Sequence, residues 1–256
     1  MGSDSLRIGC VQYLNARPLI HGWPGKVTFD HPSTLCAKLA AGKLDVALVS
    51  SFEFLRNPIY SIVDGVSISS DGPVYSVFLA YRGNLRDVEE VEIDPASQTS
   101  VNLLRCLLAE RHDLVPRFIP PTKGTATIRA KLLIGDQAIR FRQEHGRRLR
   151  YWDLGEAWRR LVALPFVYAL WLVRPGVPSP EGIANCLRAQ LDQNLKRLDE
   201  VIVASPDFDP AFCEHYYREC IQFAFGPREK GGLIAFQHVC EKHEILPPRV
   251  LDLRLI

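Results

Sequence analysis

The stretch Leu6-Arg7-Ile8-Gly9-Cys10-Val11-Gln12-Tyr13-Leu14-Asn15-Ala16-Arg17-Pro18-Leu19 decides the fold class of this chain. Residues 6–11 are mostly apolar, which is typical of a short buried strand. The strand runs into a polar turn that Pro18 closes, and this turn presents Asn15 at its tip. Because open α/β sheets bind small ligands at strand ends of this kind, the opening predicts a ligand site beside Asn15.

The residues that follow predict a strand–helix–strand unit. A second strand is expected over 26–30, a helix from Pro32 to a C-terminal Gly42, and a third strand over 44–49. Strands joined through a helix pair in parallel, with helices on the faces of the sheet. The chain is therefore expected to belong to the α/β class.

The rest of the chain predicts a second strand-rich unit, followed by helices. Further strands are expected over 60–66, 74–81, 91–93, 130–134 and 166–173, and helices over 101–108, 180–203, 210–220 and 229–244. This order fits a two-lobed, periplasmic-binding-protein-like fold of type II, with a ligand cleft between the lobes.

Crossings between the lobes are expected near residues 82–84 and at the Pro-rich break that begins near 173–176. Lobe one then comprises residues 1–83 and 175–256, and lobe two comprises residues 84–174.

Composition excludes several classes of protein. The 256 residues carry a net charge of +2 with Lys and Arg spread along the chain, so no nucleic-acid surface is expected. No apolar run reaches the roughly 18 residues of a membrane span, and no secretory signal is visible at the N-terminus. Seven cysteines without a CxxC spacing indicate a reducing compartment, so a cytoplasmic location is expected.

Motifs for common catalytic chemistries are absent from the sequence. It contains no GxSxG, GxxxxGK[ST], GxGxxG or HExxH pattern. The Cys and His residues of the last two predicted helices have the spacing of ordinary amphipathic helices. No metal or cofactor is therefore expected.

Small hydroxyl and amide side chains gather at the predicted strand ends, at Asn15, Ser50-Ser51, Ser76 and 97–100. The run Ser97-Gln98-Thr99-Ser100 opens a helix, where free backbone N–H groups and the helix dipole favour a carboxylate or phosphate. A plain N-cap explains the same run equally well. Ser76 fits a hydrogen-bonded core serine, Asn15 fits a turn residue, and Asp136 is either a helix N-cap or a catalytic acid.

Six blocks of sequence, in order, resemble one known family over residues 6 to about 174. They are VQYLNARPL (11–19), GKLDVALV (42–49), DGPVYSVFL (71–79), DPASQTSV (94–101), LLIGDQA (132–138) and DLGEAWRRLVALPFVYALW (153–171). Together they resemble the chorismate dehydratases of the futalosine route to menaquinone. The chain departs from that family at Gln98, where Arg is usual, at Val162-Ala163, where Thr-Gly is common, and in a short 118–129 segment.

The resemblance implies a lyase that dehydrates chorismate to 3-[(1-carboxyvinyl)oxy]benzoate without metal or cofactor. It implies catalytic roles for Asn15 and Ser76, and a substrate-binding role for Tyr13, Ser50, Ser97, Gln98, Thr99, Ser100 and Asp136. The proton acceptor stays open between the substrate's own enolpyruvyl carboxylate and Asp136.

Two other functions remain open at this point. One is a cytoplasmic module that binds a small aromatic or dicarboxylic acid without turnover, because fold alone does not fix function. The other is the sister 1,4-dihydroxy-6-naphthoate synthase. The YLNxxPL opening speaks against that enzyme, which has an SPCPND-like turn at this place.

Overall fold

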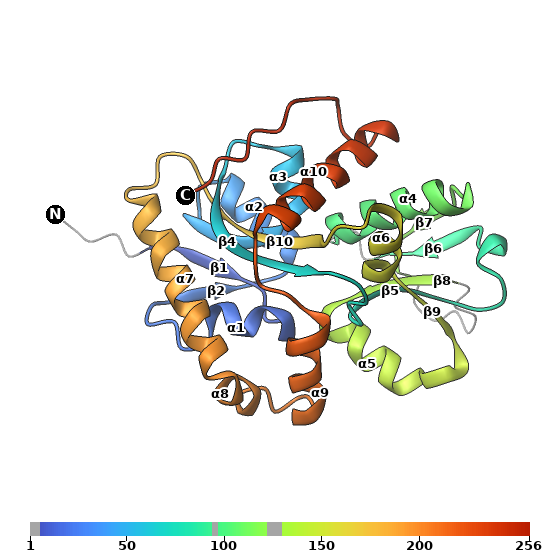
Figure 1. Ribbon diagram of the computed structural model, residues 1–256, viewed down its shortest axis with the longest axis horizontal. Coiled ribbons are helices and arrows are strands. Elements are labelled where there is room, and N and C mark those ends of the chain that lie inside the picture. Colours follow the sequence, from blue (N-terminus) through green and yellow to red (C-terminus); the bar gives the residue numbers. More distant parts are fainter. Residues whose placement is uncertain (1–5, 94–96, 122–129) are drawn as a thin grey trace.

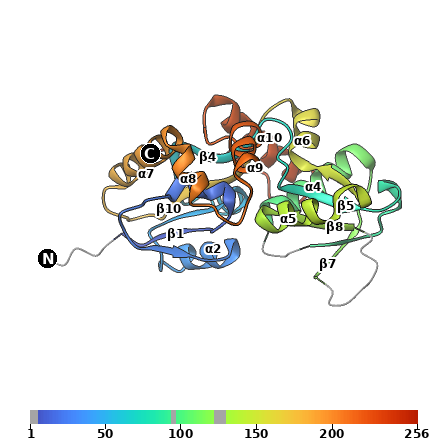
Figure 2. The same ribbon diagram turned by 90° about the horizontal axis from the view of Figure 1, so that it is seen from below.

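Two five-stranded sheets lie side by side in the computed structural model, which describes residues 6–93, 97–121 and 130–256 (Figures 1 and 2). The first sheet has the order β2-β1-β3-β10-β4 and the second the order β7-β6-β8-β5-β9. Helices cover both sheets, so the molecule has two α/β lobes, here called the first and the second after their sheets.

The strands of the first sheet are β1 (Ile8–Cys10), β2 (Val27–Phe29), β3 (Val46–Ser50), β4 (Ser61–Ser70) and β10 (Phe166–Val173). Those of the second are β5 (Val77–Tyr81), β6 (Glu90–Glu92), β7 (Arg117–Ile119), β8 (Ala130–Ile134) and β9 (Arg150–Asp153). The helices are α1 (Arg17–Ile20), α2 (Pro32–Ala40), α3 (Ser51–Arg56), α4 (Gln98–His112), α5 (Gly135–His145), α6 (Leu154–Val162), α7 (Pro180–Lys196), α8 (Leu198–Val203), α9 (Pro210–His215) and α10 (Pro227–Lys242).

The expected strand–helix–strand unit is confirmed in the first sheet. Strand β1 pairs in parallel with both β2 and β3. Strand β10 then enters between β3 and β4 and pairs antiparallel with each. The Asp45 carboxylate accepts hydrogen bonds from Arg7 and Arg174, so it ties the start of β3 to the residues that flank β1 and β10.

The chain crosses between the sheets at residues 71–76 and 163–165, one strand earlier at each crossing than the sequence predicts. Strand β5 pairs with β8 and β9 of the second sheet, and β10 pairs with β3 and β4 of the first. The expected crossings near 82–84 and 173–176 are therefore wrong. Apolar runs identify strands but do not reveal which sheet each strand joins.

Two further local predictions need correction. The strand expected from Val74 begins only at Val77, because Tyr75 has a left-handed φ of 65° that interrupts extended backbone. The helix expected over 180–203 is divided at Arg197, which has non-helical backbone angles, into α7 and α8.

A cluster of three aromatic side chains packs between the two lobes. Trp158 of α6, Phe166 of β10 and Phe236 of α10 pack edge to face, with ring centroids 4.9 to 5.9 Å apart. All three side chains are fully buried. Because α6 belongs to the second lobe and β10 to the first, this cluster fixes the lobes against each other.

The carboxylate of Asp153 holds the first crossing in place. It accepts hydrogen bonds from the backbone N–H groups of Val74 at 3.1 Å, Tyr75 at 2.8 Å and Glu156 at 3.1 Å. The last of these caps α6. One side chain at the end of β9 therefore positions both a helix start and the crossing.

Gly155, in the first turn of α6, packs so closely against that crossing that no space is left for a side chain. A Cβ atom at this position would meet the carbonyl oxygen of Gly72 and lie 2.6 Å from the Ser70 hydroxyl and 2.8 Å from the Tyr168 hydroxyl. Any larger residue must therefore push α6 away from the crossing.

We expect Gly155→Ala to lower the free energy of unfolding by about 1–3 kcal/mol, as overpacking does in tight interiors. Urea denaturation measures the change. Gly182→Ala in α7 is the matched control, because its nearest neighbour to a new Cβ is 3.7 Å away and the helix gains roughly 1 kcal/mol from Ala. Equal stability of the two variants would contradict the packing argument.

Candidate functional site

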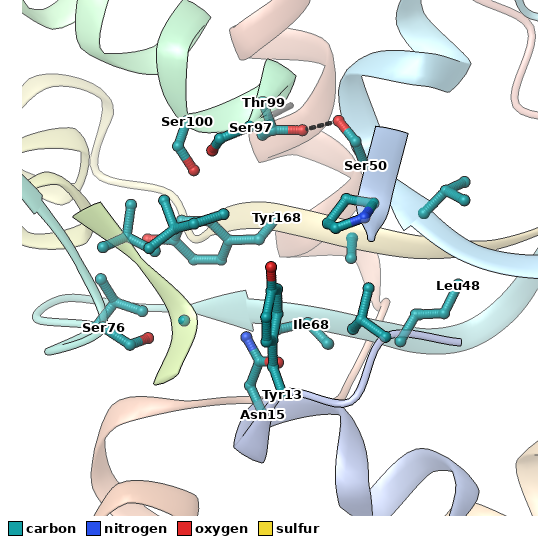
Figure 3. A pocket seen from close by; sticks show the side chains of 18 of the residues that line it. Tyr13, Asn15, Leu48, Ser50, Ile68, Ser76, Ser97, Thr99, Ser100 and Tyr168 are labelled. Carbon is teal, nitrogen blue, oxygen red and sulfur yellow. Dashed lines mark hydrogen bonds between the residues drawn. The ribbon is translucent and has the colours of Figure 1, made fainter. Parts of the chain in front are cut away.

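A cavity lies between the two sheets, and residues from both lobes line it (Figure 3). The turn after β1 supplies Tyr13 and Asn15, β3 ends in Ser50, and the first crossing supplies Ser76. From the second lobe, the residues at the start of α4 are Ser97, Gln98, Thr99 and Ser100. The structure thus brings every predicted site residue except Asp136 to one cavity.

The cavity lining is uncharged, with hydroxyl and amide groups set among mostly apolar side chains. The residues that complete it are Val11, Pro32, Leu48, Val49, Ile68, Val74, Val77, Ile134, Gly135, Tyr168, Ala169 and Ile221. None of the lining residues that the structure describes is Asp, Glu, Lys, Arg or His. The electrostatic field in the cavity therefore comes from hydroxyls, amides and backbone dipoles.

The start of α4 points at this cavity. Figure 3 shows Ser97, Thr99 and Ser100 on one side, opposite Tyr13 and Asn15. Ser97 makes no capping hydrogen bond with its side chain, so the plain N-cap interpretation is wrong for it. The first N–H groups of a helix have no partner within the helix, and here they face the cavity with the positive end of the dipole, which favours a carboxylate.

Thr99 connects the lobes at the cavity wall. Its hydroxyl is hydrogen-bonded to that of Ser50, as the dashed line in Figure 3 marks, and it accepts a hydrogen bond from the Phe52 N–H at 3.2 Å. Ser50 and Phe52 lie at the β3–α3 corner of the first lobe. This contact closes the cavity on the side of α4.

Three buried polar atoms of the cavity have no hydrogen-bond partner among the described residues: Asn15 Oδ1, Ser97 Oγ and Gln98 Oε1. Leaving such an atom unpaired costs about 1–3 kcal/mol. Three of them belong to residues that line one cavity, an arrangement that suits a ligand whose polar groups pair with them.

Ser76 is both a core serine and a cavity residue. Its side chain is fully buried, and its hydroxyl lies 2.6 Å from the hydroxyl of Tyr216. The Tyr168 hydroxyl, also at the cavity, is 3.1 Å from Ser70 Oγ. Sequence reasoning missed both tyrosines. Tyr216 lies 140 residues from Ser76, so no local pattern joins them.

Asp136 lies outside the cavity, in a neighbouring pocket that shares Val11 and Tyr13 with it. Its carboxylate accepts a hydrogen bond from the backbone N–H of Leu14 at 2.7 Å. Helix α5 already begins at Gly135 and has no side-chain cap. The N-cap interpretation of Asp136 is therefore wrong, and the carboxylate instead fastens the turn that carries Asn15.

Gly135 allows Tyr13 to stand at this boundary. The glycine has a left-handed φ of 60°, and a Cβ there would lie 3.2 Å from the Tyr13 ring. Both its conformation and its contact with the ring favour glycine. An aromatic ring of the first lobe therefore packs against the backbone of the second lobe.

Residues 6–93, 97–121 and 130–256, which the structure describes, contain neither a metal-binding cluster nor a membrane-spanning helix. No group of three or more His, Cys, Asp and Glu side chains is placed to hold a metal ion. No helix among them has the length and apolar character needed to cross a membrane.

Solved structures identify the architecture. An Archaeoglobus fulgidus protein matches with a TM-score of 0.74 at 16% identity, covering 96% of this chain and 100% of its own. The periplasmic aliphatic sulphonate binding protein of Escherichia coli matches with a TM-score of 0.66 at 14% identity, covering 99% and 91%. The molecule therefore has a two-lobed, periplasmic-binding-protein-like fold, as the sequence predicts.

Sequence relatives identify the family within this fold. The family described as menaquinone biosynthesis matches residues 6–242, and the chain belongs to it. The chorismate dehydratase of Thermus thermophilus is 31% identical over 235 aligned positions, and the match covers 82% of this chain and 86% of that protein. The chain is thus an enzyme of a biosynthetic family built on a binding-protein fold.

The environment of Asp136 predicts a pH effect on stability. Burial raises the pKa of its carboxyl above the ordinary 3.8, and the Leu14 N–H and Arg17 offset this only in part. Between pH 3.8 and the raised value the folded protein binds this proton more tightly than the unfolded chain does. The group therefore makes the free energy of unfolding fall as pH rises through that window.

Asp136→Asn lacks this titration. We expect the stability of the wild-type protein relative to this variant to decrease as pH rises from 3.8 through the folded pKa. Urea denaturation of both proteins at several pH values measures the difference. A difference that stays constant over this window would contradict the assignment.

Proposed function

We propose that the protein dehydrates chorismate to 3-[(1-carboxyvinyl)oxy]benzoate, in the futalosine route to menaquinone and in the cytoplasm. The identity of 31% to a chorismate dehydratase supports the reaction. The observation that carries the proposal is the uncharged cavity, in which a helix start and three unpartnered polar atoms converge.

The ring carboxylate of chorismate fits the start of α4. Ser97, Thr99 and Ser100 are buried there, beside the N–H groups of the first turn. These donors bind a carboxylate without a counter-charge, because backbone dipoles supply the positive potential. Gln98 stands where the family usually has Arg, so its neutral amide takes the place of a cation at this point.

The same donors favour the reaction. Removal of the C3 proton generates negative charge that delocalises through the diene into the ring carboxylate. Loss of the C4 hydroxyl then makes the ring aromatic, and the departing C4 oxygen takes up the proton removed from C3, so that one water leaves. Donors aimed at the carboxylate stabilise the charge that develops there by about 3 kcal/mol for a well-placed donor.

Asn15 and Ser76 face the other end of the substrate. In this proposal they bind and polarise the C4 hydroxyl or the enolpyruvyl group. Asn15 Oδ1 and the carboxamide N–H groups offer an acceptor and donors from one side chain, and the acceptor is unpartnered among the described residues. Asn15 lies in the turn after β1 and Ser76 at the end of the first crossing, and the fixed positions of both suit a substrate held in one orientation.

The proton acceptor in this proposal is the substrate's enolpyruvyl carboxylate. The described lining of the cavity holds no carboxylate or imidazole, and Asp136 lies in the neighbouring pocket, where its carboxylate accepts a hydrogen bond from the Leu14 N–H. Holding the substrate carboxylate near C3 gives an intramolecular transfer of high effective concentration.

Incubation of chorismate with the purified protein tests the proposed reaction directly. The ultraviolet spectrum and the product mass are expected to show a product lighter than chorismate by one water. Unchanged chorismate together with a rise in Tm would indicate a binding module. Unchanged chorismate without a Tm shift would indicate a different substrate, such as that of the sister synthase.

We expect Asn15→Ala to lower kcat for chorismate by about 10²–10³-fold, the cost of removing one oriented polar group from such a site. Steady-state kinetics with product detection measure it. Asn185→Ala, on the outer face of α7, is the matched control and retains wild-type kcat. Full turnover by Asn15→Ala would remove this residue from the mechanism.

Asp136→Asn distinguishes the two proton acceptors. The amide oxygen still accepts from the Leu14 N–H, so the Asn15 turn keeps its support. We expect kcat to stay within about threefold of wild type, because an intact neutral acceptor preserves most of a hydrogen bond. A loss of 10²-fold or more, typical of a missing general base, would make Asp136 the acceptor.

A further inference from the structure

We propose that Tyr216 is a positioning residue that fixes the hydroxyl of Ser76 as a hydrogen-bond donor toward the substrate. This inference rests on the proposed dehydration and adds a residue to it. Tyr216 lies in a π-helical turn, Tyr216–Cys220, directly after α9. Its hydroxyl is 2.6 Å from Ser76 Oγ.

The direction of this hydrogen bond follows from burial. The Tyr216 side chain is fully buried, and Ser76 Oγ is the one hydrogen-bond partner that the structure gives its hydroxyl among the described residues. If Ser76 donated the bond, the phenol proton would be buried without an acceptor, which is costly. Tyr216 therefore donates, and the proton of Ser76 stays available.

The phenol is suited to this role at neutral pH. Burial raises the pKa of Tyr216 far above the ordinary value of 10, so the phenol keeps its proton. Its ring stacks on Phe212, with ring centroids 5.8 Å apart and planes inclined by 15°. This packing holds the hydroxyl in one place.

The backbone of Ser76 is fixed on both sides. Its N–H donates to the carbonyl oxygen of Val74 at 2.7 Å, across the left-handed Tyr75, and its carbonyl oxygen accepts from the Gly135 N–H at 2.8 Å. The remaining freedom is rotation of the Ser76 side chain and its hydroxyl. The hydrogen bond from Tyr216 occupies one lone pair of Ser76 Oγ and so restricts both rotations.

The consequence is a donor oriented before the substrate binds. Ser76 lines the cavity, so the proton that this hydrogen bond leaves free is available to a substrate there. A serine hydroxyl that accepts from a phenol is also a better donor, because hydrogen bonds in a chain polarise one another. Its partner is a substrate oxygen that carries or gains negative charge, namely the departing C4 oxygen or the enolpyruvyl carboxylate.

Tyr216→Phe tests the inference in a double-mutant cycle with Ser76→Ala. We expect Tyr216→Phe alone to lower kcat about 3- to 10-fold, as loss of one hydrogen bond does, with KM changed less than about twofold. In the Ser76→Ala background it should change kcat no further, because its partner is gone. Tyr60→Phe, at a buried tyrosine outside the cavity, is the matched control and should leave kcat unchanged.

Three results would overturn the inference. Equal kcat of Tyr216→Phe and wild type, or equal losses in the two backgrounds, would mean that Tyr216 does not act through Ser76. A wild-type protein that leaves chorismate unchanged would overturn the proposed function itself, and the inference with it. Thermal unfolding checks that the Phe variant is folded.

If that variant does not fold, 3-fluorotyrosine at position 216 replaces it. This residue keeps the shape of the ring and makes the phenol a stronger donor. We then expect kcat at least equal to that of wild type, and a lower kcat would overturn the inference.

Discussion

A single buried carboxylate, that of Asp153, supports most of the arrangement described above. Its hydrogen bonds to Val74, Tyr75 and Glu156 hold the first crossing against the start of α6. Burial raises its pKa even though those three N–H groups favour the charged form, so desolvation is the larger effect. The left-handed backbone at Tyr75, and with it the position of Ser76 at the cavity, depends on this contact.

The site suits the proposed elimination on a binding-protein fold. Its donors are hydroxyls, one carboxamide side chain on each side and the start of α4. The carboxylates that position them, Asp136 behind the Asn15 turn and Asp153 behind the first crossing, do not line the cavity. The described lining residues include no Asp, Glu, Lys, Arg or His, so no formal charge of these residue types lies on the cavity wall. Aromatisation supplies the driving force, so orientation and dipoles are sufficient for the proposed chemistry.

Local sequence patterns point to part of the cavity, the family resemblance adds to it, and long-range pairing explains what both missed. Asn15, Ser50 and the 97–100 run stand at strand ends or a helix start, which apolar periodicity and turn residues mark. Periodicity alone placed Ser76 inside a strand, and the site roles of Ser76 and Tyr13 came from the resemblance. The crossings depend on which strands β5 and β10 pair with. The places of Asp136 and Tyr216 depend on partners more than 100 residues away, for which a single sequence carries no signal.

The position of β10 also bears on how the chain assembles during synthesis. All strand pairings of the second sheet lie within residues 77–153, one continuous segment, whereas β3 and β4 of the first sheet acquire their common neighbour only with residues 166–173. During synthesis, the edges of β3 and β4 that later pair with β10 therefore lack this partner strand until more than ninety further residues have been added. The lobe that begins first is completed last, and the chain depends on late, non-local strand pairing to finish it.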